Sequence, residues 1–136
     1  MTDTARPTTS YKPSISHLDE HSFGDHGERS FFLSRDLGIG QATNGDFDIR
    51  VVHAKPGPLG TTGWHYHTCG FQAVYCVRGW EDLEFEDGTK VRLEAGSCIN
   101  IPPGYRHIET GYSEDFEVIV ITSPASIGTT NVDAPF

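Results

Sequence analysis

Apolar and polar residues alternate in short runs along most of the chain from residue 30 onward. In the run 90–93, for example, Val91 and Leu93 alternate with Lys90 and Arg92. Side chains two residues apart share one face of a strand, so this period of two predicts short, half-buried strands. We expect such strands at 30–35, 47–54, 63–67, 71–77, 81–85, 90–93, 97–101, 107–110 and 116–122. No stretch has the period of a helix, so the pattern predicts an all-β sandwich or barrel.

Turn-forming residues separate the expected strands. The chain of 136 residues contains 15 glycines and 8 prolines, and clusters such as Asn44-Gly45 and Pro102-Pro103-Gly104 fall between the apolar runs. The length is that of one domain. Residues 1–29 are polar and lack periodicity, so we expect an N-terminal arm there and the folded domain at 30–136.

Charge and composition argue against several classes of partner. The formal net charge of −9 disfavours nucleic acid and anionic membranes, because both attract positively charged surfaces. No segment reaches the ~20 apolar residues that a transmembrane helix needs, and the N-terminus lacks the apolar run of a secretory signal. Three cysteines are too few and too odd in number for a disulfide framework, so we expect a reduced, cytoplasmic protein.

The stretch WHYHTCGFQ contains the strongest chemical signal in the chain. Within an expected strand, His65 and His67 point to the same face while Tyr66 points to the other. Two imidazoles on one face provide half of a metal site. A third histidine, His107, follows the Pro-Pro-Gly turn, and a tight turn that enters a strand can bring it beside the first two. The arm also contains three histidines, which we interpret as solvated loop side chains rather than a second metal site: His17, His21 and His26.

The spacing of the glycines and prolines around these histidines resembles that of the cupin family. The first cupin motif runs glycine, His-x-His, three or four residues, glutamate, six residues, glycine. The segment from Gly60 to Gly79 follows it, except that Gly60 is one residue closer to the histidines and that Gln72 replaces the glutamate. The second motif runs glycine, five residues, Pro-x-Gly, two residues, histidine, three residues, asparagine. The segment from Gly96 to Gly111 follows this motif, with Gly111 in place of the asparagine.

The resemblance, which covers residues from about 47 to 122, implies a fold, a site and an assembly. The fold would be a small antiparallel jelly-roll barrel. The site would hold one divalent metal through four ligands: His65, His67, Gln72 and His107. Many cupins dimerise through a sheet edge, and the polar arm can help to cover such an edge, so we expect a homodimer. Histidine and glutamine ligands suit Zn, Mn, Fe, Ni or Co alike, so the metal stays open.

Gln72 bears on the type of reaction. A glutamine binds through a neutral carbonyl oxygen and leaves the site one charge unit more positive than a glutamate would, which favours Lewis-acid chemistry over cycling through Fe(III). Alternatively, Gln72 turns away and the site consists of three histidines. The resemblance therefore implies a lyase, isomerase or cyclase acting on a small oxygenated organic molecule. The alternatives are a dioxygenase of the three-histidine type and a non-catalytic sensor or structural metal barrel.

Other residues near the expected site have open roles. Glu109 lies two residues after His107 on the same strand face, so we expect it either to act as the general base or to orient an imidazole. Cys69 and His53 can each face the pocket or lie outside it. Four aromatic residues either line a pocket mouth or belong to the core: Trp64, Tyr66, Phe71 and Tyr105.

Overall fold

Strands are the main regular structure in the described part of the chain. The computed structural model describes residues 6–19, 23–24, 32–55 and 60–136. Within these residues the chain forms one four-residue helix and ten strands. In chain order they are β1 (Phe32–Asp36), α1 (Ile39–Ala42), β2 (Asp48–Ala54), β3 (His65–Thr68), β4 (Phe71–Arg78), β5 (Trp80–Phe85), β6 (Lys90–Glu94), β7 (Cys98–Asn100), β8 (His107–Tyr112), β9 (Glu117–Ser123) and β10 (Gly128–Asn131).

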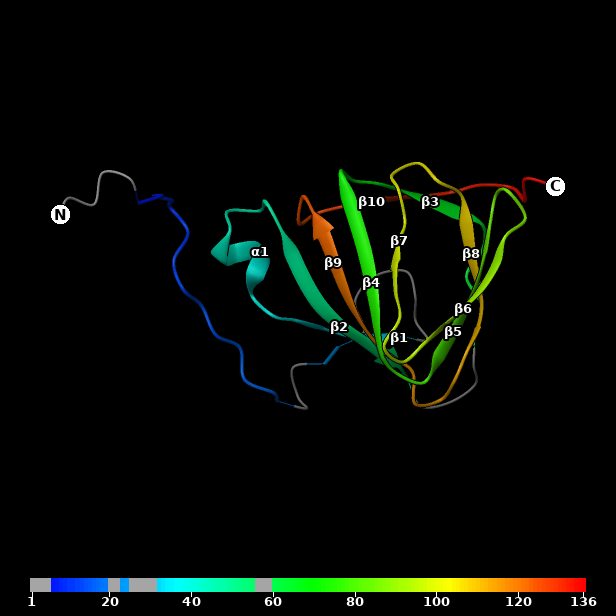
Figure 1. The fold of residues 1–136 in the computed structure, drawn as a ribbon, viewed down its shortest axis with the longest axis horizontal. Coiled ribbons are helices and arrows are strands. Elements are labelled where there is room, and N and C mark those ends of the chain that lie inside the picture. The colour runs from blue at the N-terminus through cyan, green and yellow to red at the C-terminus, as the bar shows by residue number, and fades with distance from the viewer. Residues whose placement is uncertain (1–5, 20–22, 25–31, 56–59) are drawn as a thin grey trace.

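The strands form two antiparallel five-stranded sheets that face each other (Figure 1). The first sheet has the order β1-β2-β9-β4-β7 and the second the order β10-β3-β8-β5-β6. Strands that are distant in sequence are neighbours in both sheets, which is the connectivity of a jelly roll. The prediction of an all-β jelly roll is therefore confirmed. Among the described strands no pairing joins the two sheets, so the barrel is not closed by hydrogen bonds at its seams.

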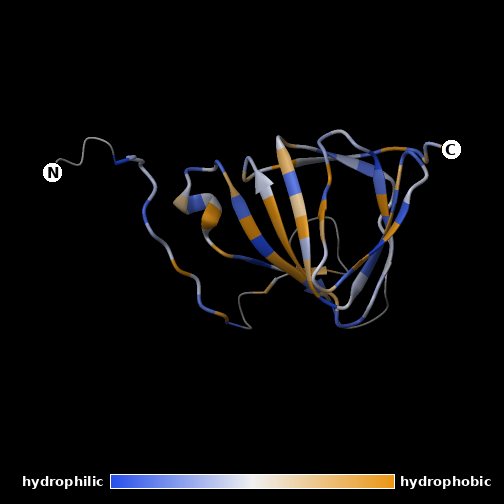
Figure 2. Cartoon of the chain, viewed as in Figure 1, coloured by the Kyte–Doolittle hydropathy of each residue, from blue (hydrophilic) through white to orange (hydrophobic). Residues whose placement is uncertain are grey.

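Strand alternation separates the core from the surface. On β5, Glu81, Leu83 and Phe85 are buried while the residues between them are half-buried. Figure 2 shows hydrophobic and hydrophilic segments alternating along the strands. The buried apolar cluster draws on both sheets, so it lies between them. Its members are Ala54, Val74, Cys76, Leu83, Phe85, Leu93, Ile101, Tyr112, Phe116 and Val118.

Two motif glycines shape the turns around the site. Gly79, between β4 and β5, has φ 71°, and a Cβ atom there would lie 2.1 Å from Oγ of Ser113. Only glycine fits such a position, because a side chain would collide and the left-handed backbone would be strained. Gly104 has φ 75°, and its N–H donates to the carbonyl of His67 at 3.0 Å. This bond fixes the turn before β8 against the strand that carries the first two histidines.

The structure adds two elements to those expected from sequence. The helix α1 is too short to produce a helical period in the sequence, and β10 (GTTN) contains no apolar residue that would mark it as a strand. In the N-terminal part, residues 6–19 form neither helix nor strand, and Gly24 makes an isolated antiparallel bridge to Ser34. His17 lies in that segment, whereas His21 and His26 lie outside the described residues.

Candidate metal centre

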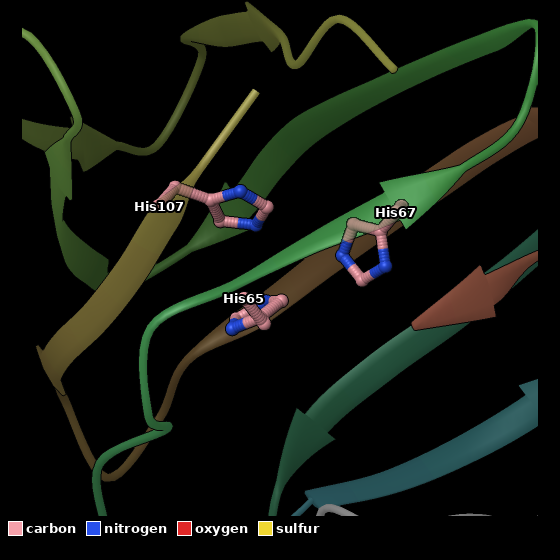
Figure 3. Close-up of side chains that lie close together, drawn as sticks. All are labelled: His65, His67 and His107. Atoms are coloured by element: carbon pink, nitrogen blue, oxygen red, sulfur yellow. The ribbon is translucent and has the colours of Figure 1, made fainter. Parts of the chain in front are cut away.

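Three of the four predicted ligands lie together between the sheets. His65 and His67 project from β3, and His107 projects from β8, where it is the direct cross-strand partner of His65. The ring centroids are 4.3 Å apart for His65 and His107, 5.0 Å for His65 and His67, and 5.2 Å for His67 and His107. One ring nitrogen of each lies within 4.8 Å of the others, and Figure 3 shows the rings grouped around one space. This arrangement fits a metal ion.

Hydrogen bonds orient two of the imidazoles. Nδ1 of His65 donates to the carbonyl of Gly63 at 2.7 Å, and Nδ1 of His107 donates to the carbonyl of Tyr105 at 3.0 Å. A carbonyl only accepts, so Nδ1 carries the proton and Nε2 of the neutral ring carries the lone pair. Metal-binding histidines use this arrangement, because the bond at one nitrogen fixes the ring and directs the other at the metal.

The third imidazole is oriented from the end of the chain. Nδ1 of His67 lies 3.0 Å from Oγ1 of Thr129, which belongs to β10. The two strands are direct neighbours, with His67 opposite Thr129. A hydroxyl can accept the Nδ1–H proton as the carbonyls do, which leaves Nε2 of His67 available to a cation as well.

Four buried side-chain nitrogen or oxygen atoms lack a hydrogen bond in the described part of the protein, and two of them belong to predicted ligands. These two are Nε2 of His107, whose residue is 0% exposed, and Oε1 of Gln72, whose residue is 6% exposed. A buried polar atom without a partner costs ~1–3 kcal/mol. Both atoms are lone-pair donors, so a cation would satisfy them where a second acceptor would not. The residues present therefore fit a metal.

Gln72 belongs to the facing sheet. It lies on β4 with its side chain on the inner face, as the burial of the alternate residues Val74 and Cys76 shows. Its cross-strand partner is Thr122, whose partner on β2 is Asp48, and all three are at most 6% exposed. The inner face of the first sheet is therefore polar at the end where Gln72 lies and apolar toward Cys76.

Glu109 lies beside two of the imidazoles. Its Oε2 is 3.6 Å from Nε2 of His65, and its Oε1 is 3.9 Å from Nε2 of His107. The hydroxyl of Thr62, a residue only 4% exposed, donates to Oε2 at 2.6 Å and accepts the backbone N–H of Glu109 at 2.9 Å. The carboxylate therefore lies beside the space that the three histidine rings surround, which we call the metal space. The strand pattern predicted this orientation, and one of the carboxylate oxygens is held by Thr62.

Glu81 is a second interior carboxyl group. It is 6% exposed, and its nearest cross-strand partners are Tyr112 and Leu93, which are 1% and 2% exposed. Burial, together with the charge of Glu109, raises the pKa of Glu81 well above its usual value. The described residues offer its carboxyl neither an ion pair nor a hydrogen bond. We did not expect this residue from sequence. Leu83 and Phe85 follow it at intervals of two on the same strand, so their inward orientation could have predicted that Glu81 also points inward.

Several candidates lie away from the metal space. His53 is on the outer face of β2, where its ring contacts Phe23 edge-on at 4.1 Å. Phe71 points outward from β4 and is 45% exposed, so it does not line the interior. Cys69 is not part of the described imidazole group, and burial raises the pKa of its thiol, which disfavours the thiolate that a metal would bind. Trp64 instead contacts Phe136, with ring centroids 5.6 Å apart.

A family model described as Cupin domain matches residues 50–122, which is more than half of the chain. The chain is a cupin. Both histidine motifs of this cupin fall inside the matched range, and so do Gln72, Glu81 and Glu109. The resemblance inferred from the two motifs is thereby confirmed. No curated protein sequence is significantly similar to the cupin.

Solved structures share the fold at low sequence identity. The polyketide cyclase RemF from Streptomyces resistomycificus has a TM-score of 0.69 at 20% identity, over 90% of each chain. KdgF from Halomonas sp. has a TM-score of 0.66 at 24% identity, over 83% of this cupin and 94% of that chain. The DMSP lyase DddQ from Ruegeria pomeroyi has a TM-score of 0.54 at 18% identity, over 65% of this cupin but 44% of that chain. At these identities the likeness establishes the fold alone.

The described part of the cupin has no helix that is long and apolar enough to cross a membrane.

Proposed function

We propose that this cupin binds one divalent metal and catalyses a non-redox reaction on a small oxygenated organic molecule, of the lyase, isomerase or cyclase type. The observation that carries the proposal is the orientation of the three histidines. The Nδ1 atoms of His65 and His107 are committed to backbone carbonyls, so the lone pairs at Nε2 face the shared space. Gln72 is the proposed fourth ligand, through its buried Oε1.

The charge of this ligand set favours Lewis-acid chemistry. Three neutral imidazoles and one neutral amide oxygen would leave the full positive charge on a bound divalent ion, which would polarise a substrate oxygen. Four protein ligands leave coordination positions open in a six-coordinate site, as a catalytic rather than a structural metal requires.

Glu109 is the proposed proton-transfer group. Its Oε2 accepts the Thr62 hydroxyl hydrogen, so Oε1 is the oxygen that remains to take a proton from a substrate carbon or hydroxyl. Its side chain is 17% exposed, so it is largely shielded from bulk water but not fully buried. A general base in this position would contribute about 10²–10⁴-fold to the rate.

The named activities of the structural neighbours are consistent with this reaction class. RemF is described as a polyketide cyclase and DddQ as a DMSP lyase. The three-histidine arrangement alone also suits a dioxygenase, but the neutral Gln72 favours a reaction that leaves the oxidation state of the metal unchanged.

The test combines metal analysis with a substrate screen. We expect about one divalent metal per chain in protein purified without chelators, and loss of that metal in the double variant His65→Ala, His67→Ala. The matched control is His53→Ala, which removes an imidazole from the outer face of β2 and should leave the metal in place. A metal content that survives the double variant would place the site elsewhere.

Small carbonyl compounds are then screened with and without oxygen. Turnover that proceeds equally under both conditions supports the proposal. Product formation that requires stoichiometric oxygen would replace it with the dioxygenase, and a fully loaded protein that only binds the compounds would replace it with a sensor.

A further inference from the structure

Arg50 is a positively charged residue on the inner face of the first sheet. On β2 it shares its face with Val52, which packs against the core, and with Ala54, which belongs to it. Its cross-strand partner on β9, Val120, also packs against the core, and the next residue across, on β4, is the core residue Val74. Because side chains two residues apart share one face of a strand, Arg50 projects into the space between the two sheets.

Arg50 is alone in this placement among the lysines and arginines of the described strands. The others lie on outer faces or at the end of a strand, and they are Arg35, Arg78, Lys90 and Arg92. A charge that faces a protein interior is costly unless it is paired or binds something of opposite charge. The question for Arg50 is therefore what its guanidinium binds.

An aspartate satisfies one part of the guanidinium. Nε of Arg50 donates to Oδ2 of Asp48 at 2.9 Å, and the aspartate is 5% exposed. The two terminal nitrogens of Arg50 make no hydrogen bond within the part of the chain that the structure describes. These nitrogens carry most of the N–H donors of the side chain, and they form the fork that binds a carboxylate through two parallel bonds. Asp48 therefore holds the guanidinium and leaves donors available.

The pair lies level with the proposed metal ligand Gln72. Asp48 is opposite Thr122, and Thr122 is opposite Gln72, so the three residues cross the sheet in one line. With neighbouring strands ~4.8 Å apart, Asp48 and Gln72 are roughly 10 Å apart across the sheet. The side chain of Arg50 is 34% exposed, whereas Gln72 is 6% exposed. Arg50 therefore lies where the polar end of the interior meets solvent.

We propose that Arg50 binds the carboxylate of the substrate, which is then a small organic acid with a second oxygen group that reaches the metal space. This inference rests on the proposed function and names its substrate class. The formal net charge of −9 repels an anion at long range, so a local positive group is needed to favour its binding. Arginine suits the task because its planar fork matches a carboxylate, and the bond to Asp48 fixes the direction of that fork.

The test measures binding rather than turnover. Straight-chain oxo acids of increasing length, from pyruvate to levulinate and its longer homologues, are compared with their methyl esters by isothermal titration calorimetry. The full-length protein is used both free of metal and loaded with zinc. We expect at least one acid to bind about tenfold or more tightly than its ester, since a charge-assisted hydrogen bond is roughly twice as strong as a neutral one. This preference should be present without metal, because Arg50 needs none.

Substitutions in the ion pair should change the preference in opposite directions. Arg50→Gln should abolish it, and Arg50→Lys should weaken it, because an ammonium group lacks the fork. Asp48→Asn should strengthen it, since the guanidinium then has no internal carboxylate. The matched control is Arg92→Gln, which removes an arginine that also pairs with an aspartate, Asp82 at 2.7 Å, but on the outer face of β6. It should leave the preference unchanged.

A neutral version of the pair keeps the test independent of folding. Arg50→Gln alone leaves the buried carboxylate of Asp48 unpaired, which destabilises the fold. The double variant Asp48→Asn, Arg50→Gln removes both charges, and circular dichroism establishes that each variant is folded. A folded double variant that keeps the native preference for acids overturns the proposal. A native protein in which no acid of the series binds more tightly than its ester also overturns it.

The two metal states separate this inference from the proposed function. A preference that appears only with zinc and survives in the double variant means that the metal binds the carboxylate, which overturns the role of Arg50 and leaves the metal site intact. A protein that takes up no metal but shows the Arg50-dependent preference refutes the proposed function and supports Arg50 as the carboxylate-binding residue.

Discussion

Thr62 and Glu109 are joined by two hydrogen bonds through one hydroxyl group. Oγ1 of Thr62 donates to Oε2 of Glu109 at 2.6 Å and accepts the backbone N–H of Glu109 at 2.9 Å. The backbone N–H of Thr62 also donates to the carbonyl of Glu109 at 3.1 Å. A carboxylate held so firmly has a fixed direction toward His65 and His107, which suits a group that transfers a proton.

The first prediction concerns Glu109. We expect Glu109→Gln to retain the metal while turnover falls by about 10²-fold or more, because the amide keeps the shape but cannot accept a proton. Thr62→Val should lower turnover less, since the carboxylate remains but is no longer fixed. The measurements are metal content and turnover of each variant. If metal and turnover fall together in Glu109→Gln, the residue supports the metal site and the base lies elsewhere.

The second prediction concerns Gln72. In metal-free protein, Gln72→Glu should lower the melting temperature, because it places a charge in a site that is 6% exposed. The increase in melting temperature on adding zinc, manganese or iron should be larger than in the native chain, since the carboxylate binds the cation more strongly. Saturation at a hundredfold above the dissociation constant corresponds to ~2.7 kcal/mol. The added charge should also lower Lewis-acid activity at neutral pH.

Gln72→Leu is the matched control for this prediction. It removes the donor oxygen without adding charge, so metal addition should raise the melting temperature by less than it does in the native chain. If both variants respond to metal as the native chain does, Gln72 is not a ligand and the site consists of three histidines. Oxygen uptake by the native iron form, measured alongside product, would favour the dioxygenase over the non-redox reaction.

The third prediction concerns pH and Glu81. The folded state raises the pKa of this carboxyl group, mainly through burial, so the folded protein holds its proton more tightly than the unfolded chain does. The free energy of unfolding therefore decreases as pH rises from about 4.3, the ordinary pKa of glutamate, through the raised folded-state pKa. Glu81→Gln should remove this loss and raise the melting temperature of metal-free protein at pH 7 by a few degrees, since ~1 kcal/mol corresponds to about 4–8 °C in a small domain.

The same comparison below pH 4 provides the internal check, because both side chains are then neutral and the difference should vanish. Glu94→Gln, on the exposed side of β6, is the matched control and should change the melting temperature neither at pH 7 nor below pH 4. A melting temperature that falls in Glu81→Gln at pH 7 would mean that the charged carboxylate makes a stabilising contact in the folded state.

The local sequence predicted the positions of the three histidines better than the positions of the buried residues on the facing sheet. The spacing of His65 and His67 fixes their common face, and the Pro-Pro-Gly turn before His107 explains how a distant strand reaches them. By contrast, Asp48 and Thr122 lie level with Gln72 only because of the register of β2, β9 and β4, which no local pattern encodes.

The alternation of inward and outward residues along a strand could also have predicted the orientations of Glu81 and Phe71. Leu83 and Phe85 alternate with acidic residues, so their inward orientation also sets that of Glu81. The outward orientation of Phe71 follows in the same way from the inward Gln72. The short strand β10 lacks such a signal, because none of its four residues is apolar.

The position of β10 has a consequence for biosynthesis. This strand follows both histidine motifs in the sequence, and its Thr129 orients His67. Since a chain is made from its N-terminus, all three histidines are synthesised before β3 acquires this neighbour. A nascent chain that stalls before residue 128 would therefore carry all three histidines while the ring of His67 lacks the partner that orients it.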